Sequence, residues 1–257
     1  MRAMTVPTSA VALLALGLSA CASEETVQGE CRDVFGGDIC TWGTMVGDDV
    51  SAFGATVALA SIENAPADAE MVFPPPFVGV VPLPPDIAAA TGFDHLGVNW
   101  EPHGHPPGAF LTPHFDFHFY TIDPNRVGTI DCADLSKPAE LPSGYTLPDM
   151  DIPGLGMLTG LCVPNMGMHA MVEDELDDTE PFDASMILGY YETGLIFLEP
   201  MIAQAKLLEA KTFTMDVPAM SRPDAPAMWP TSFEASYDDV SRTYRFAFTG
   251  FTAERGE

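Results

Sequence analysis

The sequence predicts a mainly β protein, either an antiparallel barrel or a sandwich, with one or two short helices. Segments rich in β-branched and aromatic residues recur along the chain, as is typical of strands. Twenty-four prolines in 257 residues exclude long helices over much of the length. Strands are expected at residues 55–60, 95–100, 114–122, 185–191, 195–198, 212–217, 232–237 and 244–251.

The first element in chain order is a predicted signal peptide, residues 1–20. Arg2 supplies a minimal positive charge and residues 11–18 a short apolar run, too short to span a bilayer as a mature helix. The Leu-Ser-Ala-Cys sequence that ends at Cys21 resembles the lipobox of bacterial lipoprotein precursors, in which the matching cysteine carries the lipid. We therefore expect an extracytoplasmic protein anchored to a membrane by its N-terminal lipid, with an ordinary cleaved signal as the alternative.

The remaining chain divides into an acidic tether and one domain. Residues 21–48 are acidic and glycine-rich and predict the tether, and residues 49–257 have a length that suits a single β-rich domain. The chain has 37 Asp and Glu against 10 Lys and Arg, a formal net charge of −27. Such a charge repels nucleic acid and anionic membrane surfaces. We interpret the acidic residues as a solvated coat rather than as a cation store.

Four cysteines remain after the lipid-bearing one: Cys31, Cys40, Cys132 and Cys162. An even number of cysteines in an exported chain indicates disulfides. Three pairings are possible, and we favour Cys31–Cys40 with Cys132–Cys162 because each of these closes a local loop. A thiolate metal site is the competing interpretation, but the chain has no Cys-x-x-Cys pair.

Two hairpin turns and one helix are expected in the second half of the chain. Residues 190–194 resemble a hairpin turn between two strands, and residues 238–242 turn the last hairpin. Met201, Ala205 and Leu208 follow helical spacing, which predicts a helix at about residues 200–210.

The histidines are clustered in the sequence, and this cluster is the strongest indication of a functional site. All six lie within residues 95–169, and His103, His105, His114 and His118 fall within sixteen positions. Imidazole is the commonest protein ligand of borderline transition metals. The cluster therefore predicts a site for a divalent transition metal, zinc in the first place, with iron, manganese and copper as alternatives. A hydrogen-bonded surface of histidines is the competing interpretation.

Alternation along one segment limits how this site is built. In a strand, His114, Asp116, His118 and Tyr120 share one face, and three phenylalanines share the other. At ~3.3 Å per residue, the Cα atoms of His114 and His118 are roughly 13 Å apart, too far to share one ion unless the arrangement is nearly linear. We expect Asp116 and one of the two histidines to bind the same ion. The other histidine would then contact these ligands without binding that ion, or would bind a second ion.

A second i, i+2 pair precedes this strand. His103 and His105 lie in a proline- and glycine-rich loop, and Glu101 continues the same alternation. Two such pairs on adjacent segments would supply three or four nitrogen and oxygen ligands, enough for a zinc-type or mononuclear iron-type site.

Several blocks resemble an uncharacterised family of secreted bacterial proteins. The resemblance covers roughly residues 50–252, and Glu101 and Ala170 depart from the family pattern. The blocks are residues 93–107 with His-Gly-His-Pro-Pro, residues 113–120 with Pro-His-Phe-Asp-Phe-His-Phe-Tyr, residues 166–169 with Met-Gly-Met-His, and residues 195–202 with Phe-Leu-Glu-Pro-Met.

The resemblance implies roles for two more residues. His169 becomes a closing metal ligand, and Glu199 a carboxylate that ligates metal, orients a histidine or acts as a general base. The alternative for His169 is a loop histidine bonded to the backbone. The alternative for Glu199 is the N-cap of the expected helix, since negative charge is favoured there.

Two functions are compatible with these residues. The first is a metal-dependent hydrolase or lyase on a small substrate, in which Glu199 or Asp116 moves the proton. The second is a metal-binding or metal-stabilised module without chemistry. Met166 and Met168, beside a histidine, admit a copper-handling variant because thioethers select Cu(I). An open coordination position facing a pocket favours catalysis, whereas four protein ligands favour the binding module.

Overall fold

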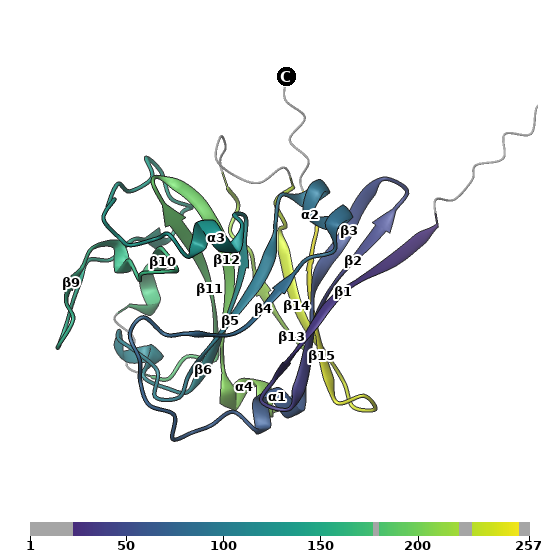
Figure 1. Ribbon diagram of the computed structural model, residues 1–257, viewed down its shortest axis with the longest axis horizontal. Coiled ribbons are helices and arrows are strands. Elements are labelled where there is room, and N and C mark those ends of the chain that lie inside the picture. The colour runs from purple at the N-terminus through teal and green to yellow at the C-terminus, as the bar shows by residue number, and fades with distance from the viewer. Residues whose placement is uncertain (1–22, 177–179, 221–227, 252–257) are drawn as a thin grey trace, which may run out of the picture.

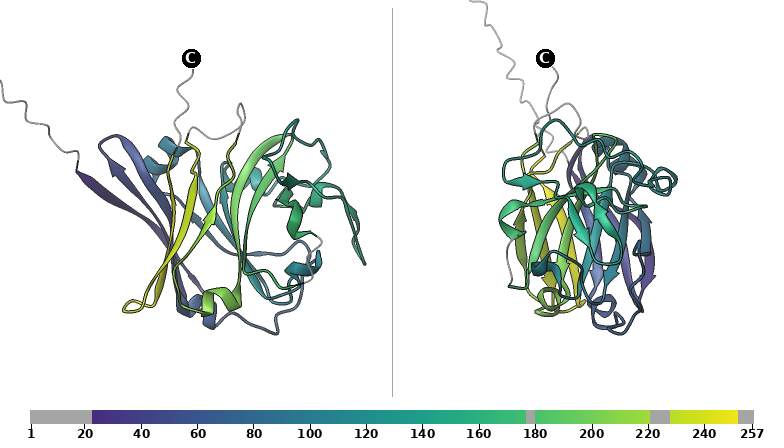
Figure 2. Two further views of the ribbon diagram at one scale, coloured as in Figure 1. Left: turned by 180° about the vertical axis from the view of Figure 1, so that it is seen from behind. Right: turned by 90° about the vertical axis from the view of Figure 1, so that its left-hand side faces the viewer.

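The computed structural model describes residues 23–176, 180–220 and 228–251, so the predicted signal peptide and Cys21 lie outside it. Two antiparallel sheets pack face to face (Figures 1 and 2). The prediction of a mainly β, antiparallel fold is confirmed. The fold is a sandwich, since none of the described strands closes either sheet into a barrel. No helix in the described ranges is long and apolar enough to cross a membrane.

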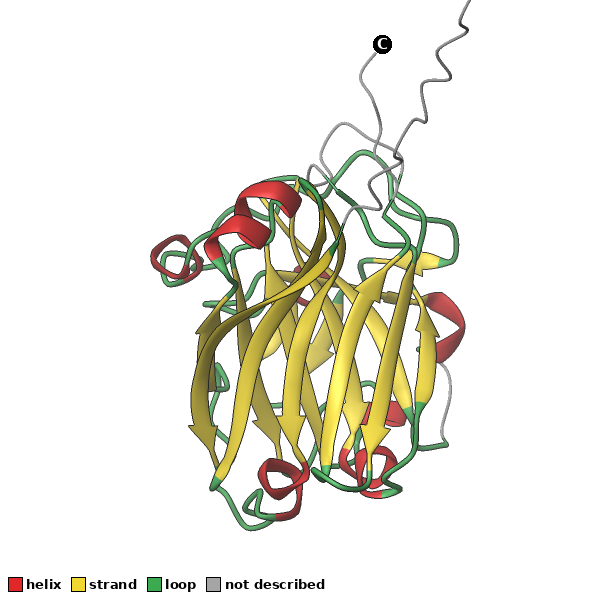
Figure 3. Ribbon diagram, turned by 90° about the vertical axis from the view of Figure 1, so that its right-hand side faces the viewer, coloured by secondary structure: helices red, strands yellow, loops and turns green. Residues whose placement is uncertain are grey.

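The six-stranded sheet joins the first and last hairpins of the described chain. Figure 3 shows the strands, in yellow, running side by side along the molecule. Its order is β1-β2-β3-β15-β14-β13. The strands are β1 (Glu24–Val34), β2 (Gly37–Val46), β3 (Asp49–Ala58), β13 (Phe213–Asp216), β14 (Ser232–Asp238) and β15 (Thr243–Thr249).

The seven-stranded sheet is built from the middle of the chain, and its order is β4-β5-β6-β12-β11-β10-β7. A separate hairpin of two short strands, β8 (Met150–Ile152) and β9 (Gly156–Leu158), stands beside it (Figure 1). The strands of the seven-stranded sheet are β4 (Phe77–Pro82), β5 (His95–Glu101), β6 (His114–Tyr120), β7 (Tyr145–Thr146), β10 (Met168–Val172), β11 (Ala184–Tyr191) and β12 (Gly194–Ala203).

The helices are short and lie at the ends of the sandwich, with α1 and α4 together at one end and α2 at the other (Figure 1). Their brevity agrees with the high proline content. The α-helices are α1 (Leu59–Glu63), α2 (Pro85–Thr91), α3 (Pro124–Val127) and α4 (Gln204–Leu208), and the 3₁₀ turns are η1 (Gly108–Phe110), η2 (Thr159–Leu161) and η3 (Glu173–Glu175).

The apolar core lies between the two sheets. Phe115, Phe117 and Phe119 are fully buried on the inner face of β6. The Phe117 ring meets Phe246 of β15 edge-on, with ring centroids 4.9 Å apart, a favoured aromatic geometry. This is the aromatic face that the alternation along residues 114–120 predicts, and it fixes which way the opposite, polar face of β6 points.

Residues 24–46 differ from the expectation of an acidic tether, because they form β1 and β2. Strand β2 pairs with β3 and buries Ile39 and Trp42. The exposed face of this hairpin carries the acidic and polar residues that suggested a tether. The disulfide Cys31–Cys40 joins two residues that lie opposite each other in the β1–β2 ladder, which confirms the favoured pairing.

The helix expected at residues 200–210 is reduced to α4, because β12 continues to Ala203. Met201 packs on the outer face of the sheet and Ile202 in the core between the sheets. This two-residue alternation prevails over the helical spacing that Met201, Ala205 and Leu208 suggested. Glu199 is therefore a buried strand residue, and the N-cap interpretation for it is wrong.

Both predicted hairpin turns are confirmed. Between β11 and β12, Glu192 and Thr193 have positive φ angles of 51° and 67°, as expected for a two-residue hairpin connection. Between β14 and β15, the Asp238 carboxylate accepts hydrogen bonds from two backbone amides of the turn.

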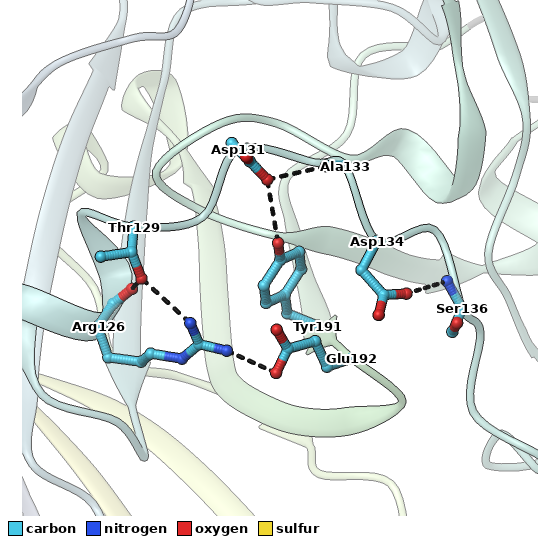
Figure 4. Close-up of polar contacts among 8 residues, drawn as sticks. All are labelled: Arg126, Thr129, Asp131, Ala133, Asp134, Ser136, Tyr191 and Glu192. Carbon is cyan, nitrogen blue, oxygen red and sulfur yellow. Dashed lines mark hydrogen bonds and ion pairs between the residues drawn. The ribbon is translucent and has the colours of Figure 1, made fainter.

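The outer face of the seven-stranded sheet is covered by the chain between β6 and β11 (Figure 2). The disulfide Cys132–Cys162 ties this covering segment together, as predicted. Figure 4 shows how the segment is fastened to the β11–β12 hairpin: Tyr191 donates a hydrogen bond to Asp131, and Arg126 pairs with Glu192. The polar face of β6 therefore lies under a pinned layer of chain and is kept from bulk solvent.

Candidate metal centre

The polar side chains gather on the outer face of three neighbouring strands. In the β5–β6 ladder, Glu101 lies opposite His114 and Asn99 opposite Asp116. In the β6–β12 ladder, Leu198 lies opposite Phe119 and Met201 opposite Asp116, so the same register sets Glu199 opposite His118. Strand pairing thus brings Glu199 beside a histidine that is 81 positions away in sequence.

The first group consists of His105, His114 and Asp116, whose ligand atoms all lie within 4.8 Å of one another. His105 comes from the loop between β5 and β6, which turns back through Gly104 at φ +63°. A Cβ on Gly104 would lie 2.0 Å from the Phe110 carbonyl oxygen, so the turn requires glycine. The His105 and His114 rings meet edge-on at 4.9 Å.

The second group consists of His118, His169 and Glu199, also within 4.8 Å of one another. Strand β10 carries His169, which lies opposite Gly189 of β11. A Cβ on Gly189 would lie 2.1 Å from the Phe197 ring, so this glycine makes room for a phenylalanine that packs against both His118 and His169.

Spacing within both groups fits ligands of a shared ion. His114 Nε2 lies 3.4 Å from Asp116 Oδ1, and His118 Nε2 lies 3.4 Å from Glu199 Oε2. None of these four buried atoms has a hydrogen-bond partner among the described residues. Ligands of one tetrahedral ion with bonds of 2.0–2.2 Å are about 3.3–3.6 Å apart. Buried polar atoms without partners cost free energy, and one cation in each group would satisfy all four.

Three of the histidines are oriented for metal binding. The Nδ1–H groups of His105, His114 and His169 donate to backbone carbonyls of Pro106, Thr112 and Leu161 at 2.9, 2.8 and 3.0 Å. This hydrogen bond fixes the tautomer and leaves the Nε2 lone pair free, which is the usual arrangement of metal-ligating histidines. The alternative role for His169, a loop histidine bonded to the backbone, is thus compatible with ligation, because Nδ1 makes that bond.

Burial sets the charges of both groups. It lowers the pKa of His114 and His118 well below the usual range and that of His169 to about 4, so these imidazoles are neutral at pH 7. Burial also raises the pKa of Glu199 and, with the negative charges of Glu199 and Glu101, that of Asp116. Neutral imidazoles and carboxylates without a countercharge make a site that favours a divalent cation.

A pocket of about 280 Å³ opens onto both groups. Its polar lining comprises Glu101, His105, Asp116, His169 and Glu199. No Lys or Arg of the described chain lines it, so a bound cation would meet no competing positive charge. Burial raises the pKa of Glu101 to about 7, and this carboxyl belongs to neither ligand group.

Two histidines stay apart from the site. His103 is exposed and belongs to neither group, although its i, i+2 spacing with His105 suggested a shared ion. The turn at Gly104 directs the two side chains differently. His95 stacks on Tyr120 at 4.9 Å and donates to Asp94 at 2.9 Å, which is a structural role.

Comparison of the chain with protein-family models, with curated proteins and with solved structures found no match in any of the three. The functional argument therefore rests on the site. Sequence reasoning found four of the six members of the two groups from the histidine cluster and its strand, and the resemblance added His169 and Glu199. It did not find the pocket walls. Those walls combine residues of three different strands, such as Met171, Ile187 and Met201, with residues of the β8–β9 hairpin and of loops, and no single segment has a period that predicts them.

Proposed function

We propose that this protein is an extracytoplasmic hydrolase or lyase that uses two divalent metal ions, zinc in the first place, on a small substrate. The observation that carries the proposal is the pair of His₂-carboxylate groups, each with unpaired donor atoms, opening on one pocket. Each group offers three protein ligands, the number typical of catalytic zinc sites that keep a position for water or substrate.

The residues divide the work as follows. Asp116 and Glu199 act as ligands in this proposal, rather than moving the proton as the sequence suggested. Glu101 remains free of both groups and lines the pocket, so we assign proton transfer to it. A bound divalent ion would supply Lewis acidity to water or to a substrate oxygen. Phe197 and the covering chain keep bulk water away from the floor of the pocket.

The compartment supports the same proposal. Two disulfides agree with an oxidising, extracytoplasmic location. We further propose that Cys21 carries the lipid anchor and that the chain belongs with the secreted bacterial proteins it resembles. Labelling of cells with a radioactive fatty acid, followed by isolation of the wild-type protein and a Cys21→Ser variant, tests the anchor: label on both proteins would contradict it.

Metal content is the primary test. We expect about two equivalents of zinc in protein purified from the periplasm, about one in His105→Ala and about one in Glu199→Gln, measured by elemental mass spectrometry. The matched control is His103→Ala, two positions from His105 but exposed, which should keep two equivalents. Metal-free wild-type protein that also takes up none of zinc, iron, manganese or copper would refute the proposal.

The disulfide next to the site should matter for metal affinity. Cys162 follows Leu161, whose carbonyl oxygen orients His169, so we expect Cys132→Ser/Cys162→Ser to weaken zinc binding at the His118–His169–Glu199 group about 10- to 100-fold. Competition titration with a zinc chelator measures this on protein shown to be folded by circular dichroism. Cys31→Ser/Cys40→Ser, in the distant β1–β2 hairpin, should bind zinc as tightly as wild type. Equal weakening in both variants would indicate a general loss of stability instead.

A further inference from the structure

The pocket has two chemically different parts. Its floor carries the two ligand groups, whereas its walls are almost entirely apolar. Thioethers and aliphatic side chains dominate these walls, which adapt to varied apolar shapes. The thioethers are those of Met71, Met166, Met171 and Met201.

The mouth of the pocket is also apolar. The described chain has nine exposed large hydrophobic side chains, and four of them, Met71, Val72, Phe73 and Leu155, line this one pocket. Val72 is 56% exposed. Scattered exposed hydrophobics need no explanation, but a group that gathers at a pocket on a chain of net charge −27 indicates an apolar ligand.

The apolar residues at the mouth are not well placed to contact a membrane. Hairpin β8–β9, which contributes Ile152 and Leu158 to the wall, lies at the opposite end of the molecule from the start of β1 (Figures 1 and 2). An N-terminal anchor would therefore hold the mouth away from its own bilayer. The strong acidic charge also disfavours contact with anionic lipid surfaces.

We infer that the ligand is an amphiphile with an oxygen-bearing head, such as an acyl ester or amide, and an apolar chain or ring. The inference rests on the proposed function, because the head is placed at the two metal groups. The tail lies along the walls and reaches the rim at Met71, Val72 and Leu155. Two divalent ions outweigh the negative charges of Glu101, Asp116 and Glu199, so the loaded floor attracts a polar oxygen.

A hydroxamate series tests the inference on the zinc-loaded full chain, because hydroxamates bind zinc through oxygen. Each buried methylene tightens apolar binding by up to about fourfold. We expect octanohydroxamate to bind at least on the order of 10²-fold more tightly than acetohydroxamate, by isothermal titration. Val72→Asn should reduce this ratio about three- to tenfold and leave acetohydroxamate binding unchanged. Val240→Asn, at a 96% exposed valine in the β14–β15 turn, is the matched control. It should change neither the affinity ratio of the two hydroxamates nor the affinity for acetohydroxamate.

The outcomes separate the inference from the proposed function. If both hydroxamates bind with equal affinity, the apolar ligand is refuted and the metal site stands. If the protein takes up no metal, the walls are tested alone with 1-octanol against ethanol on the metal-free chain. Octanol binding that Val72→Asn weakens would still support the apolar ligand, and the absence of octanol binding would refute it.

Discussion

Zinc is expected to raise the free energy of unfolding by about 4 kcal/mol for each bound ion when free zinc is about one thousand times its Kd. The stabilisation arises because the six ligands come together only in the folded chain: the β6–β12 pairing brings Glu199 to His118, and β10 adds His169. For a chain of this length, 1 kcal/mol shifts the melting temperature by about 2–4 °C. Thermal unfolding in zinc buffer and in chelator should therefore differ by at least about 10 °C.

Magnesium provides the control for this shift. Nitrogen ligands suit zinc, whereas magnesium prefers oxygen ligands in an octahedral arrangement. Magnesium at the same excess should leave the melting temperature within about 1 °C of the chelator-treated protein. A shift equally large with magnesium would mean that the carboxylates alone hold the cation and that His114 and His118 play no part. A zinc-bound protein whose melting temperature does not change would contradict binding at these groups.

The sequence was sufficient to predict one strand and which side chains lie on each of its faces. Strict alternation along residues 114–120 told which side chains enter the core, and the structure buries Phe117 between the sheets and turns Asp116 outward. The distance argument that His114 and His118 cannot share an ion also holds, since each belongs to a different group. The alternation of side chains and the distance between two positions are local properties of a strand, so the sequence alone is enough to predict them.

Contacts made by distant segments were beyond such reasoning. The spacing of His103 and His105 suggested one shared site, but a positive φ at Gly104 and the fold of its loop expose the first and direct the second inward. The partition of the six candidate ligands into two groups depends on which strand pairs with β6 and on its register. Periodicity in one segment specifies neither property. The pocket walls likewise combine residues of several strands and loops, which no period within one segment predicts.

The outer face of β6 is costly without a cation. Together with its neighbours β5 and β12, it places three carboxyl groups, Glu101, Asp116 and Glu199, among buried neutral imidazoles and apolar side chains. Each ionised group there loses hydration that no described Lys or Arg restores. Because the covering chain keeps water from these carboxyl groups, they lower the free energy of unfolding of the metal-free protein. The largest stability gain from a single substitution should thus come from neutralising one of these ligands.

Glu199→Gln is expected to act with opposite signs in the two forms of the protein. In the metal-free chain it removes the cost of a buried, uncompensated carboxylate, so unfolding at pH 8 should require about 1–3 kcal/mol more than in wild type. In the presence of zinc the order reverses, because the variant loses the stabilisation by one ion. Urea unfolding at pH 8 in chelator and in zinc buffer measures both. Glu234→Gln, at an exposed glutamate of β14, is the control and should be neutral in both.

The difference in free energy of unfolding between metal-free Glu199→Gln and wild type should depend on pH, because the pKa of Glu199 is raised in the folded chain. Burial raises the pKa of Glu199 well above its usual value of 4.5, so the folded chain holds the proton more tightly than the unfolded chain. The stability contributed by the protonated carboxyl is complete below pH 4.5 and is lost as pH rises toward the folded value. Between pH 5 and pH 8, the free energy of unfolding of metal-free Glu199→Gln should therefore rise relative to that of the metal-free wild type. The histidines titrate in both proteins and largely cancel in the difference, so a flat difference would show that Glu199 is not held in a desolvated site.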